Sequence, residues 1–285
     1  MTSSGMRYGA VLPGGTATEQ VQLGVLAERC GWDAVFTWEA AYGVEPWSVL
    51  AAMAVGTSHV RLGTMLTPLP WRRPWKVASQ VATLDQLSRG RAILAVGVGA
   101  TETNLPDTGE EVRLRERAEM LDEGIDLIRA LWDGKGSYEG RHYRYHSGRT
   151  DLVAAVRPVQ DRIPLWVVGV WPGPKSMRRV LRCDGLIPQF RESGTDAGPD
   201  GVRAARLWLA ENGARADLDV IADGETPAGD PGAAADEASG WAKAGCTWWL
   251  ETRWGVQEDL AQRIAAMRER LEAGPPRGAA EGATS

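Results

Sequence analysis

Carboxylates that follow apolar, strand-like runs are the first candidates for acid–base chemistry in this sequence. Glu39 ends the run AVFTWE and stands directly after Trp38. Partial burial at that position is expected to raise the pKa of Glu39, which would let the carboxyl group give or take a proton. Glu102, Glu192 and Glu251 also follow apolar runs, where solvated or salt-bridged carboxylates are the commoner case. We therefore predict Glu39 and Trp38 as the catalytic positions.

Histidine and cysteine are too sparse and too scattered to suggest a nucleophile or a metal site. The three histidines are His59, His142 and His146, and none follows a predicted strand. A histidine base, a Ser-His-Asp triad and a histidine-rich metal site are therefore disfavoured, and we predict no metal. The three cysteines are far apart and lack CxxC spacing, as expected for reduced thiols in a cytoplasmic protein.

The sequence WPGPKS, residues 171–176, is the best candidate for an anion site. A Gly/Pro turn there opens a predicted helix, whose first N–H groups have no partner within the helix. Lys175, Arg178 and Arg179 add positive charge, which suits a phosphate group. An ordinary surface helix with basic residues would show the same pattern, so the residues alone leave both interpretations open.

Four tryptophans stand at the ends of four different predicted strands. They are Trp38, Trp71, Trp171 and Trp254. If these ends meet, the indoles predict an aromatic pocket for a flat ligand, with packing at a rim as the alternative. The glycines of Gly97-Val98-Gly99, after another strand, either let a ring approach the backbone or only turn the chain.

The elements that must position these residues are clearest between residues 61 and 100. This region predicts a strand over Arg61–Leu66, a helix over Pro74–Ser88 and a second strand over Arg91–Val96. Two prolines follow the first strand and cannot donate ladder hydrogen bonds, so we expect that strand to end at Leu66. Apolar strands without alternation are typical of parallel sheets that are covered on both faces.

The same alternation of strand and helix runs through the whole chain. The predicted strands are Arg7–Pro13, Ala34–Glu39, Arg61–Leu66, Arg91–Val96, Pro164–Val170, Leu186–Phe190, Asp217–Ala222 and Cys246–Thr252. The predicted helices are Thr18–Arg29, Pro46–Val55, Pro74–Ser88, Arg113–Asp133, Lys175–Arg182, Gly201–Glu211, Ala233–Ala244 and Glu258–Leu271. This order indicates an α/β fold, a single (β/α)8 TIM barrel with its functional residues on the loops after the strands. A doubly wound sheet is the alternative, but no GxGxxG motif follows the first strand.

One domain is predicted over residues 6–273, with one interruption. Residues 134–163 break the alternation and are expected to form an inserted loop or hairpin between the fourth and fifth strands. Residues 1–5 and the Pro/Gly/Ala-rich residues 274–285 are expected to be disordered.

The overall composition disfavours several classes of protein. No run approaches the roughly 18–20 apolar residues of a membrane span, and the first residues lack the apolar stretch of a signal peptide. The net charge of −5 disfavours a nucleic-acid binder, which usually carries a basic excess. We therefore expect a cytoplasmic protein whose partner is a small molecule.

Several segments, taken in order, resemble the luciferase-like flavin/deazaflavin oxidoreductase family over residues 6–275. They are LGTMLTPLPWRRPWKVASQVATLDQLSRGR, LAVGVG, ERAEMLDEGIDLIRALW, YEGRHY, RPVQDRIPLWVVG and WWLETRWG. The resemblance is to the branch that uses coenzyme F420, and it implies a TIM barrel with the cofactor ring at the carboxyl ends of the strands. It also implies a non-prolyl cis peptide against the ring, at Met65–Leu66, and a cofactor phosphate near residues 169–179.

The positions at strand ends and the resemblance together assign expected roles to individual residues. Contacts with the cofactor are expected from Thr64, Met65, Leu66, Gly97, Gly99, Gly169, Gly173, Pro174, Lys175, Ser176 and Arg178. Contacts with the substrate are expected from Tyr42, Trp71, Glu102, Trp171, Phe190 and Trp254. Relatives often have an acid followed by a histidine after the second strand, and here Glu39 is followed by Ala40. The nearby Tyr42 is a candidate substitute for that histidine.

Three functions follow from these expectations. The first is an F420-dependent oxidoreductase that moves a hydride between the deazaflavin and a small organic substrate. The second is an FMN-dependent luciferase-like monooxygenase. The third, which only Ala40 supports, is a barrel that has lost its redox cofactor and binds a ligand or catalyses a cofactor-free reaction. By analogy with relatives, the helix over Arg113–Asp133 is a candidate homodimer interface.

Overall fold

A computed structural model of the chain describes residues 5–100, 109–191, 197–254 and 259–278. Eight parallel strands close into a barrel, in the order β1-β10-β9-β8-β7-β4-β3-β2. The strands are β1 (Arg7–Val11), β2 (Ala34–Thr37), β3 (Arg61–Pro68), β4 (Ala92–Gly97), β7 (Leu165–Trp171), β8 (Gly185–Phe190), β9 (Asp219–Gly224) and β10 (Trp248–Glu251). The predicted TIM barrel is confirmed.

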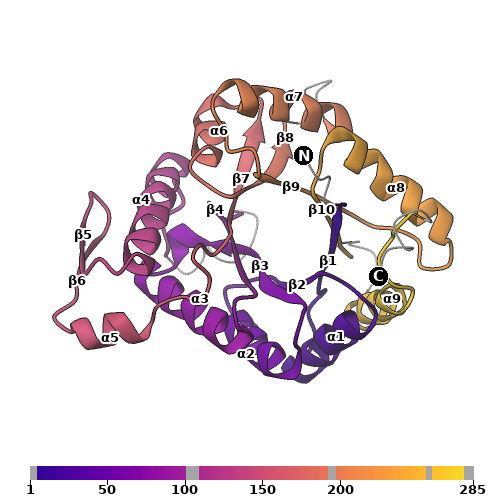
Figure 1. Ribbon diagram of the computed structural model, residues 1–285, viewed down its shortest axis with the longest axis horizontal. Coiled ribbons are helices and arrows are strands. Elements are labelled where there is room, and N and C mark those ends of the chain that lie inside the picture. The colour runs from indigo at the N-terminus through magenta and orange to yellow at the C-terminus, as the bar shows by residue number, and fades with distance from the viewer. Residues whose placement is uncertain (1–4, 101–108, 192–196, 255–258, 279–285) are drawn as a thin grey trace.

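Helices surround the barrel as an outer ring (Figure 1). They are α1 (Ala17–Arg29), α2 (Pro46–Gly56), α3 (Pro74–Ser88), α4 (Leu114–Trp132), α6 (Pro174–Val180), α7 (Gly198–Glu211), α8 (Pro231–Ala244) and α9 (Leu260–Glu272), with a 3-10 turn, η1 (Leu69–Trp71), before α3. Local sequence explains several of their starts. Thr16 with Glu19, and Asp259 with Gln262, form capping boxes at α1 and α9, and a proline begins α2, α3 and α6.

The structure corrects the predicted end of the third strand. β3 continues past Leu66 through Thr67 and Pro68, which pair with the last two residues of β4. The prediction was wrong because the register shifts between Thr64 and Thr67, which restores the pairing beyond an irregularity. A proline in the final position of a strand removes only one donor from the ladder.

The insertion between β4 and β7 lies outside the ring of helices, beside α4 (Figure 1). It contains an antiparallel hairpin of β5 (Ser137–Glu139) and β6 (Arg144–His146), followed by the short helix α5 (Thr150–Ala155). The hairpin was one of the two predicted forms of this segment. The helix α5 was not predicted, because its six residues show no clear helical periodicity.

Two apolar clusters make up the core. One lies between the strands and the helices, and the other fills the inside of the barrel. The inner cluster consists of Val11, Ala34, Phe36, Ile93, Ala95, Trp166, Ile187, Ile221, Trp248 and Leu250, with Met65, Leu66 and Val168 packed against it. Trp166 is its centre, with ring centroids 5.4 Å from Phe36 and 5.3 Å from Trp248. The inner cluster shows which residue of each strand faces inward, because side chains alternate along a strand.

Candidate functional site

The inner cluster ends in an apolar floor at the carboxyl-terminal mouth of the barrel. Met65 and Leu66 on β3 and Val168 on β7 are only half-buried there, although they pack on the inner cluster. Gly97 on β4 lies among them, and a Cβ atom at Gly97 would approach Leu66 to 3.1 Å and Val168 to 3.2 Å. The floor is therefore smooth and apolar, and a flat ring can rest on it.

The peptide bond between Met65 and Leu66 is cis. The resemblance implied a non-prolyl cis bond at this position, and the structure confirms it. Both residues of this bond belong to the apolar floor. The structure thus places the three predicted cofactor contacts Met65, Leu66 and Gly97 together.

Glu39 points away from the mouth, into a polar cluster behind β2 and β3. Its Oε1 accepts hydrogen bonds from the Thr67 hydroxyl at 2.6 Å and the Trp47 indole at 3.2 Å. Its Oε2 accepts from the Arg72 guanidinium at 2.9 Å. The hydroxyl of Thr64 lies 2.8 Å from that of Thr67, so Thr64, a predicted cofactor contact, belongs to this cluster and not to the floor.

Burial raises the pKa of Glu39, as the sequence predicted, although Arg72 and the hydrogen bonds from Thr67 and Trp47 oppose the shift. The side chain of Glu39 is only 4% exposed. Its carboxylate joins β2, β3 and α2, and its oxygens face protein donors. The proton-transfer role of Glu39 stays a prediction, and a proton would reach the mouth only through the neighbouring hydroxyls.

Trp38 has the opposite orientation to Glu39 because it continues the inward face of β2 after Ala34 and Phe36. Its ring is 38% exposed and lies 3.6 Å from a Cβ atom placed at Gly14. A hollow of about 250 Å³ adjoins it between the loops after β1 and β2 and the start of α9. Tyr42 is 99% exposed, so its side chain lines no pocket in this structure.

The other predicted aromatic contacts do not gather around one pocket. Trp71 is buried, donates from its indole to the Glu111 carbonyl at 2.8 Å, and lies under the Arg117 guanidinium. A Cβ atom at Gly99 would lie 2.2 Å from the Trp71 ring, so Gly99 allows the loop after β4 to pass over this ring. Trp71 and Gly99 therefore support that loop.

Trp171 and Phe190 lie on the outward faces of β7 and β8, since Val168 and Ile187 occupy the inward faces. Both pack against the outer core, and the Trp171 ring lies 6.5 Å from the Trp208 ring on α7. Trp254, after β10, is exposed. The sequence alone locates these aromatic residues at strand ends, but it does not determine whether each side chain faces into or out of the barrel.

The turn into α6 presents two uncommitted positive charges near the mouth. In the described part of the chain, Lys175 and Arg178 are exposed and make no ion pair. By contrast, Arg179 pairs with Asp122 at 2.8 Å, and Arg182 pairs with Asp126 at 3.0 Å, both on α4. Two of the four cations of this segment thus fasten α6 to α4, and two are available for an anion.

The remaining predicted contacts on this segment shape its backbone. The Ser176 hydroxyl accepts from the Val170 amide at 2.9 Å, so it holds the turn and does not face outward. Gly173 precedes α6, and Pro174 is its first residue. A Cβ atom at Gly169 would lie 2.4 Å from Leu186, on the outward side of β7. Ser176, Gly173 and Gly169 allow the turn to form, while the first amides of α6 stay without helical partners.

Two polar residues of the mouth were missed by the sequence-based prediction. Asp223 on β9 faces inward with Ile221, and its register partner Leu250 belongs to the inner cluster. Gln189 on β8 faces inward with Ile187, and the side chains of Gln189 and Asp223 are exposed at the mouth. Counting every second residue from the apolar centre of each strand would have found them.

The carboxyl group of Asp223 has a raised pKa. Burial raises the pKa of its carboxyl group, and a hydrogen bond from Trp254 opposes the shift. The side chain of Asp223 is exposed at the end of β9, on the inward face of the strand. Perturbed carboxyl groups in such places are candidates for functional residues.

The other carboxylates at strand ends have different surroundings. Glu251 is fully buried on the outer side of β10 and pairs with Arg253 at 2.5 Å. It therefore has a structural role. Glu102, a predicted substrate contact, and Glu192 lie outside the described residues.

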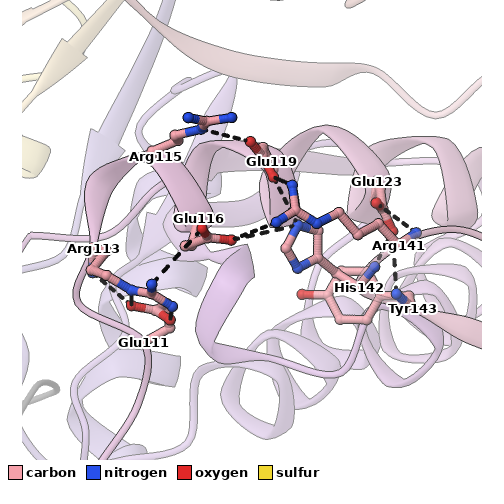
Figure 2. A network of polar contacts seen from close by, with 9 residues as sticks. All are labelled: Glu111, Arg113, Arg115, Glu116, Glu119, Glu123, Arg141, His142 and Tyr143. Carbon is pink, nitrogen blue, oxygen red and sulfur yellow. Dashed lines mark hydrogen bonds and ion pairs between the residues drawn. The ribbon is translucent and has the colours of Figure 1, made fainter.

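A separate polar cluster fastens the insertion to α4 (Figure 2). Glu119 on α4 accepts from Arg141 at 2.6 Å and lies 3.2 Å from the His142 ring, and Glu123 accepts the backbone amide of Arg141 at 2.9 Å. The ligand atoms of Glu116, Glu119 and His142 lie within 4.8 Å of one another. Arg141 pairs with both carboxylates, Glu116 and Glu119, so the cluster is an ion-pair network.

The described helices include none that is long and apolar enough to cross a bilayer.

Comparison with known proteins relates the whole chain to one family. The family model described as luciferase-like monooxygenase matches residues 2–285. The phthiodiolone/phenolphthiodiolone dimycocerosates ketoreductase of Mycobacterium tuberculosis is 35% identical over 187 residues, which are 63% of this chain and 47% of that protein. A protein of the same organism assigned as a coenzyme F420-dependent oxidoreductase is 32% identical over 202 residues, which are 68% of this chain and 56% of that protein. The chain thus spans about half the length of the curated relatives it matches.

Solved structures share the fold at low sequence identity. An F420-dependent secondary alcohol dehydrogenase in complex with an F420-acetone adduct superposes with a TM-score of 0.72 at 18% identity, covering 94% of this chain and 99% of that one. The oxygenating constituent of 3,6-diketocamphane monooxygenase from Pseudomonas putida, in complex with FMN, gives 0.70 at 16% identity, covering 96% and 99%. These likenesses establish the fold.

Proposed function

Because the chain belongs to the luciferase-like monooxygenase family, we propose that it is an F420-dependent oxidoreductase that transfers a hydride between the deazaflavin and a small organic substrate. Members of this family are enzymes, and relatives and structural neighbours use F420 or FMN. The observation that carries the choice of site is the apolar floor at the ends of β3 and β7, together with two uncommitted cations on α6, the helix that follows β7. We place the reaction at this mouth of the barrel, where TIM-barrel enzymes hold their active sites.

The residues at the mouth fit the parts of such a cofactor. Met65, Leu66 and Val168 offer an apolar face for the ring, and Gly97 adds no side chain of its own beside Leu66 and Val168. The first amides of α6, with Lys175 and Arg178, would hold the phosphate. When bound, F420 supplies a ring carbon that accepts or gives a hydride.

The protein's own contribution is orientation. The floor fixes one face of the ring, so a substrate is confined to the opposite face. The buried cluster of Glu39, Arg72 and Thr67 holds the ends of β2 and β3 in place and thereby keeps Trp38 on the mouth side. Glu39 itself is a positioning residue in this proposal.

The substrate class is proposed from the ketoreductase among the relatives. That protein's name gives reduction of a ketone, and the same hydride chemistry in reverse oxidises a secondary alcohol. We therefore propose ketones and secondary alcohols as the substrate class. A mouth with an apolar floor suits a substrate with one polar oxygen and an apolar remainder.

The second candidate is an FMN-dependent monooxygenase. The description of the family itself and the FMN-bound structural neighbour favour it. The floor accepts the ring of either cofactor, because the two rings have the same flat shape. What separates the candidates is the tail of the cofactor, since F420 carries additional negative charge that Lys175 and Arg178 can bind.

Removing the two uncommitted cations together is expected to weaken F420 binding strongly. For Lys175→Ala combined with Arg178→Ala we expect the Kd of F420 to rise by about 10–100-fold, because the double variant loses two charge-assisted contacts with the cofactor. The melting temperature is expected to stay the same, because neither side chain pairs within the described residues. Fluorescence titration of F420 measures the Kd.

A matched control removes two positive charges elsewhere. Lys135→Ala combined with Arg144→Ala, on the insertion, leaves the mouth intact, and the Kd of F420 is expected to stay within about twofold of the wild type. If both double variants weaken binding equally, net charge and not the α6 turn holds the cofactor, and the proposed phosphate site is wrong.

A further inference from the structure

The mouth of the barrel has one polar side, beside the apolar floor. Val170 on β7 pairs in register with Gln189 on β8, and Asp223 on β9 pairs with Leu250 on β10. Residues paired in register on parallel strands face the same side, so Gln189 and Asp223 face inward from the adjacent strands β8 and β9, each three residues beyond the last residue that pairs between these two strands. The opposite side of the floor consists of Met65, Leu66 and other apolar groups.

Neither polar residue serves the fold in the described part of the chain. Gln189 is exposed, and its amide has no protein partner within the described residues. Asp223 accepts a hydrogen bond from the indole of Trp254, which is itself exposed. The carboxylates of Glu39 and Glu251, by contrast, are enclosed by two or more donors each. An amide and a carboxylate that face an open floor are available to a ligand.

We propose that Gln189 and Asp223 form a polar subsite that binds the oxygen of a secondary alcohol or ketone above the apolar floor. This inference rests on the proposed function and adds the residues that recognise the substrate. The Gln189 amide donates a hydrogen bond to the oxygen, and Asp223 exchanges a proton with it. The raised pKa of Asp223 supports this use, because both protonation states become accessible closer to neutral pH.

The proton balance of the step is simple. In the oxidation of a secondary alcohol, the carbon gives up a hydrogen with two electrons to the oxidised deazaflavin. The hydroxyl oxygen gives up its proton, which the Asp223 carboxylate accepts, and the carbon–oxygen double bond forms. Ketone reduction returns the proton from Asp223 to the oxygen.

Substitution of Asp223 tests the subsite. The wild type, Asp223→Asn and Gln189→Leu are titrated with F420 and then assayed with F420 and 2-propanol, 2-butanol or cyclohexanol between pH 5 and 9. For Asp223→Asn we expect kcat/KM to fall at least tenfold, with the Kd of F420 within threefold of the wild type. In the wild type, kcat/KM for oxidation should rise with pH as Asp223 loses its proton, and Asp223→Asn should lack that rise.

Two further measurements separate catalysis from folding. For Gln189→Leu we expect KM to rise severalfold with a smaller effect on kcat. A carboxylate with a raised pKa destabilises the fold above its unfolded pKa, so Asp223→Asn should raise the melting temperature at pH 8 and not at pH 4. Asp236→Asn, the same change on the exposed face of α8, is the control and should alter none of these quantities.

The outcomes distinguish this inference from the proposed function. If the wild type binds F420 but Asp223→Asn keeps kcat/KM within twofold, or loses F420 affinity in the same proportion, the subsite is not as proposed. If the wild type binds F420 and oxidises none of the three alcohols, the assigned substrate class is wrong and the inference is overturned. If the wild type binds neither F420 nor FMN, the proposed function fails and this inference fails with it.

Discussion

Replacing Glu251 with leucine is expected to destabilise the protein by about 3–5 kcal/mol, because the change leaves buried positive charge without its partner. Glu251 is 0% exposed and accepts from the Thr226 amide at 2.7 Å and from the Arg253 guanidinium at 2.5 Å. Arg270 on α9 lies 3.6 Å away and is itself buried. One carboxylate thus joins the end of β10, the loop after β9 and the last helix.

The expected loss corresponds to a fall in melting temperature of about 5–8 °C for a chain of this size. Thermal unfolding followed by circular dichroism measures it. Glu272→Leu, at an exposed glutamate on α9, the helix that carries Arg270, is the matched control and should change the melting temperature by little. Equal effects of the two variants would show that the buried pairs of Glu251 contribute no net stability.

Replacing Gly97 with leucine is expected to abolish binding of the cofactor. A Cβ atom at this position already approaches Leu66 and Val168 to 3.1–3.2 Å, so the rest of a leucine side chain has to extend over the floor. We expect the Kd of F420 to rise at least about 100-fold, because a ring cannot rest on the floor and avoid the new methyl groups. Fluorescence titration of F420 is the measurement.

Two controls accompany this variant. Gly97→Ala adds only the Cβ atom and should weaken binding much less. Gly136→Leu, at a position with open space around its Cβ, should leave the Kd of F420 unchanged. A Gly97→Leu protein that melts as a folded protein and binds F420 like the wild type would show that the ring lies elsewhere.

Most of the fold could be predicted from the sequence because its pattern repeats. Apolar strands alternate with helices that begin at prolines or capping residues, and the order of eight such pairs has one common architecture. The end of β3 could not be predicted, because the register shift after Thr64 depends on pairing with β4. The short helix α5 lacks both length and periodicity.

The site was predictable only to the level of strand ends. Whether a residue at a strand end faces the mouth depends on the phase of the alternation, which is set by the packed inner cluster. Glu39 and Trp171 therefore turned out to face outward, while Asp223 and Gln189 face inward without having been singled out. The family resemblance supplied the cis bond at Met65–Leu66, which no residue pattern indicates.

The central claim is that the mouth holds a deazaflavin, and one titration tests it most directly. The purified wild-type protein is titrated with F420 and, separately, with FMN, by fluorescence and difference absorbance, and the two are then set in competition. We predict saturable binding of F420 at least about tenfold tighter than that of FMN. Tighter binding of FMN would contradict the claim and favour the monooxygenase. Binding of neither would also contradict it and would favour a barrel without a redox cofactor, the function that Ala40 supports.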